Sequence, residues 1–94
     1  MDLDQRIAVS SDALFQEVEG EAVILDLAQG QYFGLDEVGT RIWQLLQTHG
    51  TVRAVFDQML DEFDVEPERL EADLEALLQA LADSGLVNLG PAGP

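Results

Sequence analysis

The pattern of apolar and polar residues changes its period once in the first half of the chain, near Asp36. Before that point, residues 22–27 form an apolar run of strand length, and after it apolar residues recur at helical spacing from Val38 onward. A carboxylate at Asp36 can accept hydrogen bonds from the free N–H groups of a first helical turn. The pattern therefore predicts a strand that ends near Leu35 and a helix that begins directly after Asp36.

Two neighbouring segments complete a small predicted sheet. Residues 14–18 alternate loosely between apolar and polar side chains, and the turn-like residues 19–21 lead into the run 22–27, which is typical of a hairpin. Gly30 can take the left-handed conformation that a three-residue hairpin loop commonly needs, and residues 31–35 then return. Because the run 22–27 is apolar on most of both faces, we expect it to be the central strand of an antiparallel meander.

Three helices are predicted after the sheet. The first spans residues 37–48 and is followed by Gly50, which can act as a left-handed C-terminal cap. Thr51 is a candidate N-cap for a second helix with one apolar stripe. Pro67 suits the first turn of a third helix, which spans roughly residues 68–84 and stops at a glycine.

The two ends of the chain carry weaker patterns. We expect residues 1–13 to form an N-terminal extension with no assigned element, residues 14–89 to form the folded domain, and residues 90–94 to form a flexible, frayed tail. Residues 86–89 are apolar enough for a short extended piece at the end of the domain.

Composition restricts the partners and the compartment. Ninety-four residues make one domain with a modest core, and 19 acidic against 4 basic residues give a formal charge of −15. Such a charge disfavours nucleic acid and anionic lipid surfaces and attracts basic peptides or basic protein faces. With no cysteine, no signal-peptide pattern and no apolar run long enough for a membrane span, we expect a soluble cytoplasmic protein.

Catalytic chemistry is not visible in the sequence. There is no nucleophile with a base, no metal-ligand spacing and no glycine-rich phosphate loop, and the only histidine, His49, has no partner. We therefore expect neither enzymatic activity nor a cofactor or metal. An acyl carrier protein is disfavoured because Ser84, after Asp83, closes a helix instead of opening one. A DNA-reading winged helix is disfavoured because the third helix is rich in acidic residues.

The last predicted strand, residues 31–35, is unusual for the edge of a sheet. Natural edges are normally protected by Lys, Pro or a covering element, whereas this strand reads Gln-Tyr-Phe-Gly-Leu. In the simpler interpretation, Phe33 and Leu35 are core residues and Tyr32 is a half-exposed aromatic residue. In the functional interpretation, the outer backbone of the same strand accepts an extended peptide as an added strand. The two interpretations are compatible.

Several motifs of the sequence are distinctive: Leu-Asp-Leu-Ala-Gln-Gly-Gln-Tyr-Phe-Gly-Leu-Asp-Glu-Val-Gly-Thr-Arg-Ile-Trp at residues 25–43, Phe-Asp-Val at 63–65, Glu-Ala-Asp-Leu at 71–74 and Ser-Gly-Leu-Val at 84–87. Together with the order of the predicted elements, these motifs resemble the PqqD-like family. This family contains the leader-peptide recognition elements of ribosomally made, modified peptides, including small stand-alone proteins of lasso-peptide pathways. The resemblance covers about residues 14–89.

The resemblance implies an α+β fold, with a three-stranded sheet followed by three helices in a winged helix-turn-helix arrangement, and no catalytic activity. It also implies that a precursor's leader pairs with the third strand of the sheet and lies in the groove beside the third helix. We expect Asp73 either to meet a basic group of the leader or to be plain surface charge. The implied peptide-binding residues are Gln31, Tyr32, Phe33, Gly34, Leu35, Leu70, Asp73, Leu74, Leu77 and Leu78.

The resemblance leaves the pathway open. We favour a leader-binding partner of a lasso-type machine, in which a leader peptidase and an asparagine-synthetase-like cyclase are separate enzymes. The alternative within the family is a peptide chaperone for a radical-SAM enzyme. A different class of function, a structural or regulatory interaction module that uses its acidic faces, also fits the composition.

Overall fold

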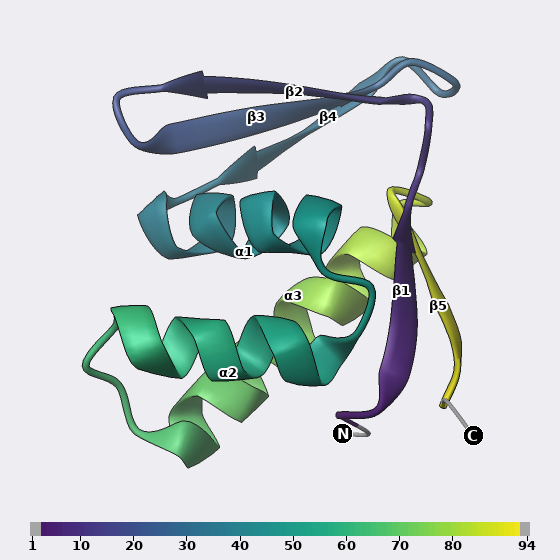
Figure 1. Cartoon of the computed structure of the whole chain (residues 1–94). Coiled ribbons are helices and arrows are strands. Elements are labelled where there is room, and N and C mark those ends of the chain that lie inside the picture. The colour runs from purple at the N-terminus through teal and green to yellow at the C-terminus, as the bar shows by residue number, and fades with distance from the viewer. Residues whose placement is uncertain (1–2, 93–94) are drawn as a thin grey trace.

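The computed structural model describes residues 3–92, which form two small sheets and three helices (Figure 1). In chain order the elements are β1 (Gln5–Val9), β2 (Ala13–Val18), β3 (Glu21–Asp26), β4 (Gln31–Leu35), α1 (Glu37–Thr48), α2 (Val52–Glu62), α3 (Pro67–Asp83) and β5 (Val87–Ala92). One sheet has the strand order β2-β3-β4, and the other consists of β1 and β5. The predicted α+β architecture, a meander followed by three helices in a winged-helix-like arrangement, is confirmed.

The central strand β3 pairs antiparallel with β2 on one side and β4 on the other. Ile24 of β3 is fully buried and stands opposite Phe15 of β2 and Phe33 of β4, so these three side chains face the helices. The turn from β2 to β3 has only two residues, Glu19 and Gly20, and both have positive φ, at 55° and 83°. This pattern is that of the hairpin turn whose twist matches the twist of the strands.

The loop from β3 to β4 is held by a buried carboxylate. Oδ1 of Asp26 accepts hydrogen bonds from the backbone N–H of Ala28 at 3.0 Å and of Gln29 at 3.4 Å. Gly30 has a φ of 72°, as the sequence predicted for this loop. The loop therefore has a defined shape and fixes the point at which β4 begins.

Most helix boundaries follow the predicted local signals. The side chain of Thr51 accepts a hydrogen bond from the N–H of Ala54 and caps α2, and Pro67 occupies the first turn of α3. Gly85 follows α3 with a φ of 78°, so it ends the helix in the left-handed conformation.

The prediction of a left-handed cap at Gly50 is wrong. The chain leaves α1 through His49 in an extended conformation, and Gly50 is not among the described glycines with positive φ. The reason is a contact with a distant segment: the N–H of Ile7 donates to the carbonyl of Gly50 at 3.0 Å, and Arg6 forms a bridge with Thr51. The end of α1 is thus shaped by pairing with β1.

A ribbon of two strands joins the two ends of the described chain. β1 pairs antiparallel with β5, with Ile7 opposite Leu89 and Val9 opposite Val87. Ile7 is buried in the core together with Val87, so a residue before the expected start of the domain at residue 14 contributes to the core. Residues 90–92 continue β5, which corrects the expected frayed tail there; residues 1–2 and 93–94 lie outside the described residues.

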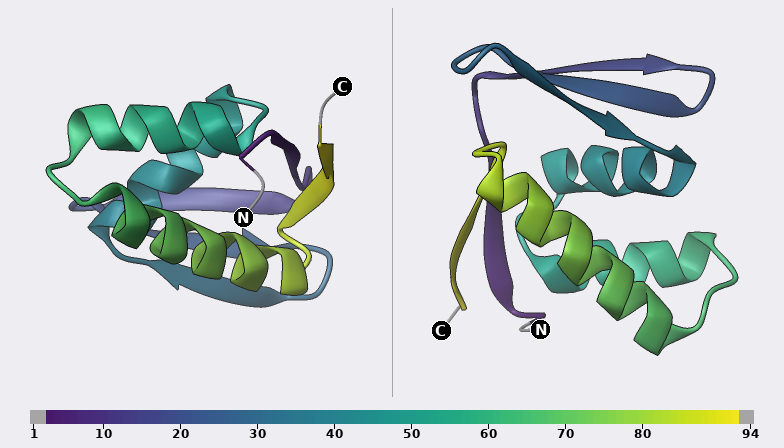
Figure 2. Two further views of the ribbon diagram at one scale, coloured as in Figure 1. Left: turned by 90° about the horizontal axis from the view of Figure 1, so that it is seen from below. Right: turned by 180° about the vertical axis from the view of Figure 1, so that it is seen from behind.

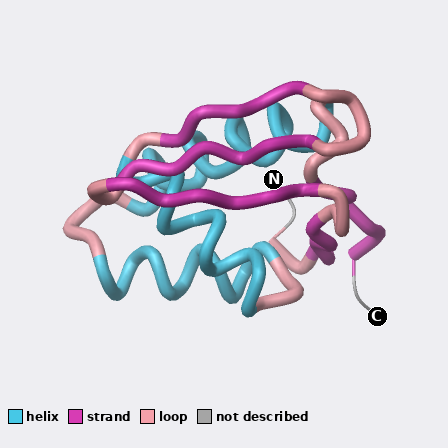
Figure 3. Tube along the Cα trace, turned by 90° about the horizontal axis from the view of Figure 1, so that it is seen from above, coloured by secondary structure: helices cyan, strands magenta, loops and turns pink. Residues whose placement is uncertain are grey.

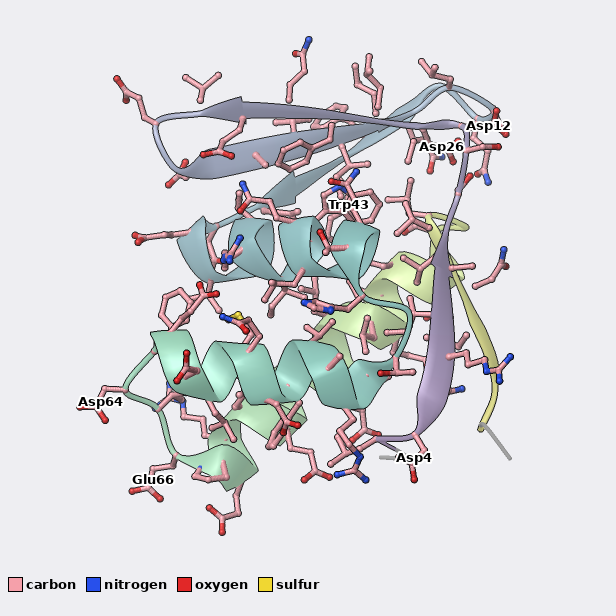
Figure 4. All side chains as sticks on the ribbon, in the orientation of Figure 1. Asp4, Asp12, Asp26, Trp43, Asp64 and Glu66 are labelled. Carbon is pink, nitrogen blue, oxygen red and sulfur yellow. The ribbon has the colours of Figure 1, made fainter. Side chains whose placement is uncertain are left out.

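The core lies between the sheet and the helices and among the helices themselves. Trp43 of α1 is fully buried and sits between the sheet and its helix (Figure 4). All three helices lie on one side of the three-stranded sheet, and none of the described helices or strands covers the other side (Figures 1 and 3). Within residues 3–92, no helix has the length and apolar character needed to cross a membrane. The buried apolar residues are Ile7, Ala22, Ile24, Leu35, Ile42, Trp43, Leu45, Leu46, Val52, Val55, Phe56, Met59, Leu70, Leu74, Leu78, Leu81, Leu86 and Val87.

Candidate functional site

Strand β4 forms one edge of the three-stranded sheet, and within residues 3–92 no strand pairs with its outer side (Figure 2, right). Among the described residues, no backbone hydrogen bond outside the sheet begins or ends at residues 31–35. Phe33 and Leu35 face the helices, whereas Tyr32 is 76% exposed on the opposite face. Because an edge strand leaves alternate N–H and C=O groups unpaired, β4 can accept a further extended segment.

The turn from β4 into α1 places a helix start beside this edge. Oδ1 of Asp36 accepts a hydrogen bond from the N–H of Gly39 at 2.7 Å, which caps α1 as the sequence predicted. A Cβ on Gly39 would stand 3.2 Å from that oxygen and 3.2 Å from Cδ2 of Leu35, so the glycine allows the turn to be tight. As a result, Val38 lies next to the end of β4 with 40% of its surface exposed.

Helix α3 provides the opposite wall. Arg69, Asp73 and Leu77 follow each other at intervals of four residues and form one stripe along the helix. Nε of Arg69 lies 3.9 Å from Oδ2 of Asp73, and both side chains are mostly exposed. Such an exposed pair is weakly held, so either charge can exchange its partner for a group on a ligand.

A groove of about 680 Å³ lies between these walls. Where α1 begins, the groove continues into a second hollow of about 490 Å³ that reaches the loop between α2 and α3. The two hollows share Val38, Arg69 and Asp73, and the second adds the apolar side chains of Phe63 and Val65. The residues that line the first groove are Gly34, Leu35, Asp36, Val38, Gly39, Ile42, Arg69, Asp73 and Leu77.

The sequence-predicted site residues fall into three groups. Gly34, Leu35, Asp73 and Leu77 come together in the groove. Gln31, Tyr32 and Phe33 lie further along the same edge strand, where they border a cavity of only about 20 Å³.

The third group consists of leucines that face inward. Leu74 and Leu78 are 0% and 1% exposed and belong to the core, so they support α3 instead of lining the groove. Leu70 is also nearly buried, but it borders the second hollow. The stripe of α3 that contains Leu74 and Leu78 therefore packs against the core. The stripe that contains Arg69, Asp73 and Leu77 faces the groove.

Sequence reasoning missed Val38 and Arg69 as parts of the groove. Val38 was assigned to the helical apolar pattern, although an apolar residue in a capped first turn beside a strand end is well placed to stay exposed. Arg69 carries a signal of its own, because it is the one basic residue between Pro67 and the end of the sequence. Its position four residues before Asp73 places both on one helix face.

The groove is suited to binding an extended chain. It combines an open strand edge, apolar walls from Val38, Ile42 and Leu77, and two opposite charges at Arg69 and Asp73. Within the described part of the chain, no three His, Cys, Asp or Glu residues lie close enough together to hold a metal ion. These features match recognition by strand addition, in which backbone bonds give affinity and side-chain pockets give selectivity.

Two solved structures share this fold. One chain, described as TbiB1 in complex with the TbiA(beta) leader peptide, is 36% identical over 90% of this chain and 98% of its own, with a TM-score of 0.80. A lasso peptide synthetase B1 complexed with the leader peptide is 23% identical, covers 87% of this chain and 96% of its own, and shares the fold with a TM-score of 0.75. No curated protein matches the sequence significantly.

The amino-acid sequence alone also matches a known protein family. The model of coenzyme PQQ synthesis protein D, PqqD, matches residues 21–87, which run from β3 to the first residue of β5. This match covers well over half of the chain and includes the β4 edge, the turn at Asp36 and all of α3. The chain therefore belongs to the PqqD family.

Proposed function

We propose that this protein binds the leader segment of a ribosomally made precursor peptide and presents it to separate modifying enzymes. The observation that carries the proposal is the open edge of β4, which runs beside a groove walled by α3. The 36% identical TbiB1 chain is described in complex with a leader peptide, and this supports the same class of ligand here. In this function the protein is an adaptor without catalytic activity of its own.

The leader adds to β4 as a fourth strand of the sheet. Its backbone pairs with the free side of residues 31–35, and its inward side chains enter the groove between Val38 and Leu77. A few apolar anchors supply most of the affinity in interfaces of this kind. The charge of −15 adds electrostatic steering for leaders that carry basic groups, one of which Asp73 is placed to meet.

The proposed pathway is that of a lasso peptide, with a leader peptidase and a cyclase as the partner enzymes. The lasso peptide synthetase B1 with the same fold supports this assignment. The alternative is a peptide chaperone for a radical-SAM enzyme, and the family model that matches describes a protein of coenzyme PQQ synthesis.

A scan with N-methylated peptides tests strand addition directly. The fluorescently labelled TbiA(beta) leader peptide, which is named with the 36% identical chain, is titrated and followed by anisotropy, with one backbone nitrogen methylated at a time. Methylation removes a backbone donor, so affinity is expected to fall at every second position across about five residues and to stay unchanged between them. Equal losses at all positions, or no losses in a peptide that binds, contradict strand addition.

Salt separates this function from the acidic interaction module. Leader binding that rests on apolar anchors and backbone bonds persists in moderate salt, because screening weakens only the exposed charge contacts. Binding that disappears in about 0.3 M NaCl and ignores changes at Val38 and Leu77 would favour the acidic module instead.

A further inference from the structure

The face of the three-stranded sheet that points away from the helices carries several exposed apolar side chains, and no other described element covers it (Figure 3). The strand register places Gln16 and Val18 of β2, Val23 of β3 and Tyr32 of β4 on this outer face. Val18 is 72% exposed and Tyr32 76%. Among the described residues, the large apolar side chains that are exposed are Leu14, Val18, Val23, Leu27, Tyr32 and Val38, and all but Val38 lie on this face or in the adjoining turn. A gathering of this kind on a small acidic protein marks an interaction surface.

The rim of the outer face is acidic, and the strands that form the sheet contain no basic residue. Glu19 and Glu21 stand at the β2–β3 turn, and Asp36 follows the end of β4. The sequence has no Lys, Arg or His between Arg6 and Arg41, a stretch that contains the whole sheet. An apolar centre with a negative rim is complementary to an apolar patch with a rim of Lys or Arg.

The outer face adjoins the proposed peptide site. It is hollowed by about 610 Å³ beside Gly34, where nothing stands within 4 Å of the position of a Cβ. Gly34, Leu35 and Asp36 border both this hollow and the groove on the other side of β4. A protein seated on the outer face would therefore lie within reach of a peptide added to the edge of β4.

We propose that the outer face of β2, β3 and β4 is the docking surface for the enzyme that processes the bound peptide, through a patch on that enzyme with an apolar centre and a basic rim. This inference rests on the proposed function, because it identifies where the partner of the adaptor sits. The peptide and the enzyme then occupy neighbouring but separate surfaces, so both bind at the same time.

A second copy of the chain fits the face less well. Two copies would bring two acidic rims together, and each copy carries a formal charge of −15. Like charges placed opposite one another disfavour such an interface. The same rim excludes anionic lipid surfaces.

The test measures enzyme docking and leader binding on the same variants. The leader peptidase and the cyclase of the proposed pathway are purified and titrated separately against the full chain by biolayer interferometry. The double variant Val18→Thr/Val23→Thr keeps β-branched side chains, so the strands are retained while the apolar centre is lost. It is expected to weaken docking of at least one enzyme by tenfold or more and to change leader affinity by less than twofold.

Charge reversal tests the rim with a matched control. Glu21→Lys on the outer face is expected to weaken docking at least fivefold at low salt, with the difference shrinking as salt is added. Glu75→Lys makes the same change on the exposed side of α3 and should leave docking unchanged. Circular dichroism of all variants confirms that each is folded.

The outcomes separate the two proposals. If no enzyme binds the wild type, or if docking ignores both Val18→Thr/Val23→Thr and Glu21→Lys, the docking surface is overturned. If light scattering shows a wild-type dimer that the double variant abolishes, the occupant is a second copy and the proposal is also overturned. A third outcome is that the folded variants lose enzyme docking although the wild type binds no leader peptide. This result would support the docking surface and refute the adaptor function.

Discussion

Arg41 of α1 and Glu62 of α2 form an ion pair with two parallel hydrogen bonds. Nε of Arg41 donates to Oε1 of Glu62 at 2.6 Å, and Nη2 donates to Oε2 at 2.7 Å. Nη1 of Arg41 also donates to Gln44, whose amide donates to Glu17 of β2. This chain of polar contacts connects α2 through α1 to β2, and so ties two of the helices to the sheet.

The ion pair predicts a component of acid sensitivity. The hydrogen bond from Arg41, with help from Gln58, lowers the pKa of Glu62 from 4.5 to about 2. The carboxylate of Glu62 therefore loses its charge at a lower pH in the folded protein than in the unfolded chain. The stabilisation from the ion pair is present above about pH 4.5 and is lost as the pH falls towards about 2. Glu62→Gln should therefore lower the thermal midpoint near neutral pH, and the difference from wild type should shrink by pH 2.

Glu75→Gln is the control for this experiment, because it removes one negative charge from an exposed part of α3. The measurement is the thermal midpoint followed by circular dichroism at several pH values. A Glu62→Gln variant whose deficit stays constant from neutral pH to pH 2 would show that the pair does not titrate as described.

The hairpin turn from β2 to β3 contains a strained residue that can be relieved. Glu19 has a φ of 55°, a conformation that Asn and Gly adopt more readily than Glu. Glu19→Asn is expected to raise the free energy of unfolding by about 0.5–1 kcal/mol, because the turn needs left-handed residues at both positions. For a domain of this size that corresponds to a rise of a few degrees in the thermal midpoint.

Calorimetry measures this effect, and Glu21→Asn on β3 serves as the control. Asn is unfavourable within a strand, so the same substitution should destabilise there. Equal effects at the two positions would contradict the argument from backbone conformation.

Two leucines on α3, three residues apart, should respond differently to truncation. Leu74 is 0% exposed, so Leu74→Ala leaves a cavity and should lower the free energy of unfolding by about 2–5 kcal/mol. Leu77 lines the groove and is only partly buried, so Leu77→Ala should destabilise less and weaken leader binding in a folded protein. Urea unfolding followed by Trp43 fluorescence measures the first effect, and peptide titration measures the second.

Val38 offers a groove substitution that is compatible with its helix. Val38→Gln places a good helix former in the first turn of α1 but removes an exposed apolar side chain from the wall of the groove. We expect leader affinity to fall about tenfold, whereas Val18→Gln, which changes an exposed valine on the other face of the sheet, should leave it unchanged. Equal leader affinity in the two folded variants would place the peptide elsewhere.

The charge on the α3 wall should contribute modestly. Asp73→Asn removes the carboxylate beside Arg69 and should weaken a leader with a basic group about threefold at low salt. The difference should disappear as the ionic strength rises, because both charges are exposed. An effect that is independent of salt would indicate that Asp73 is structural and not a contact for a charged group.

Local signals in the sequence predicted the elements that have local causes. Asp36 and Thr51 cap helices where expected, and Gly30 and Gly85 take the left-handed conformation where expected. The central position of β3 followed from its apolar residues on both faces. In each case the residue that causes the structure lies within a few positions of it.

The features that were missed depend on distant segments. β1 has one buried residue, Ile7, and becomes a strand because β5 supplies its partner backbone from the other end of the chain. The chain leaves α1 through an extended His49, and Gly50 takes no left-handed conformation, because the N–H of Ile7 donates to the carbonyl of Gly50. The groove itself needs β4 and α3 to meet in space, so the sequence could indicate both walls but could not separate the inward stripe with Leu74 from the groove stripe with Leu77.

The β1–β5 ribbon also determines how this protein can be tethered. Gln5 and Ala92 pair at the end of the ribbon that lies away from the three-stranded sheet (Figure 1). A flexible linker attached at either end would therefore leave the molecule from the same place, with the edge of β4 and the outer face of the sheet unobstructed. An enzyme fused through such a linker would experience a local concentration in the millimolar range next to the captured peptide, without any change in the adaptor's own surfaces.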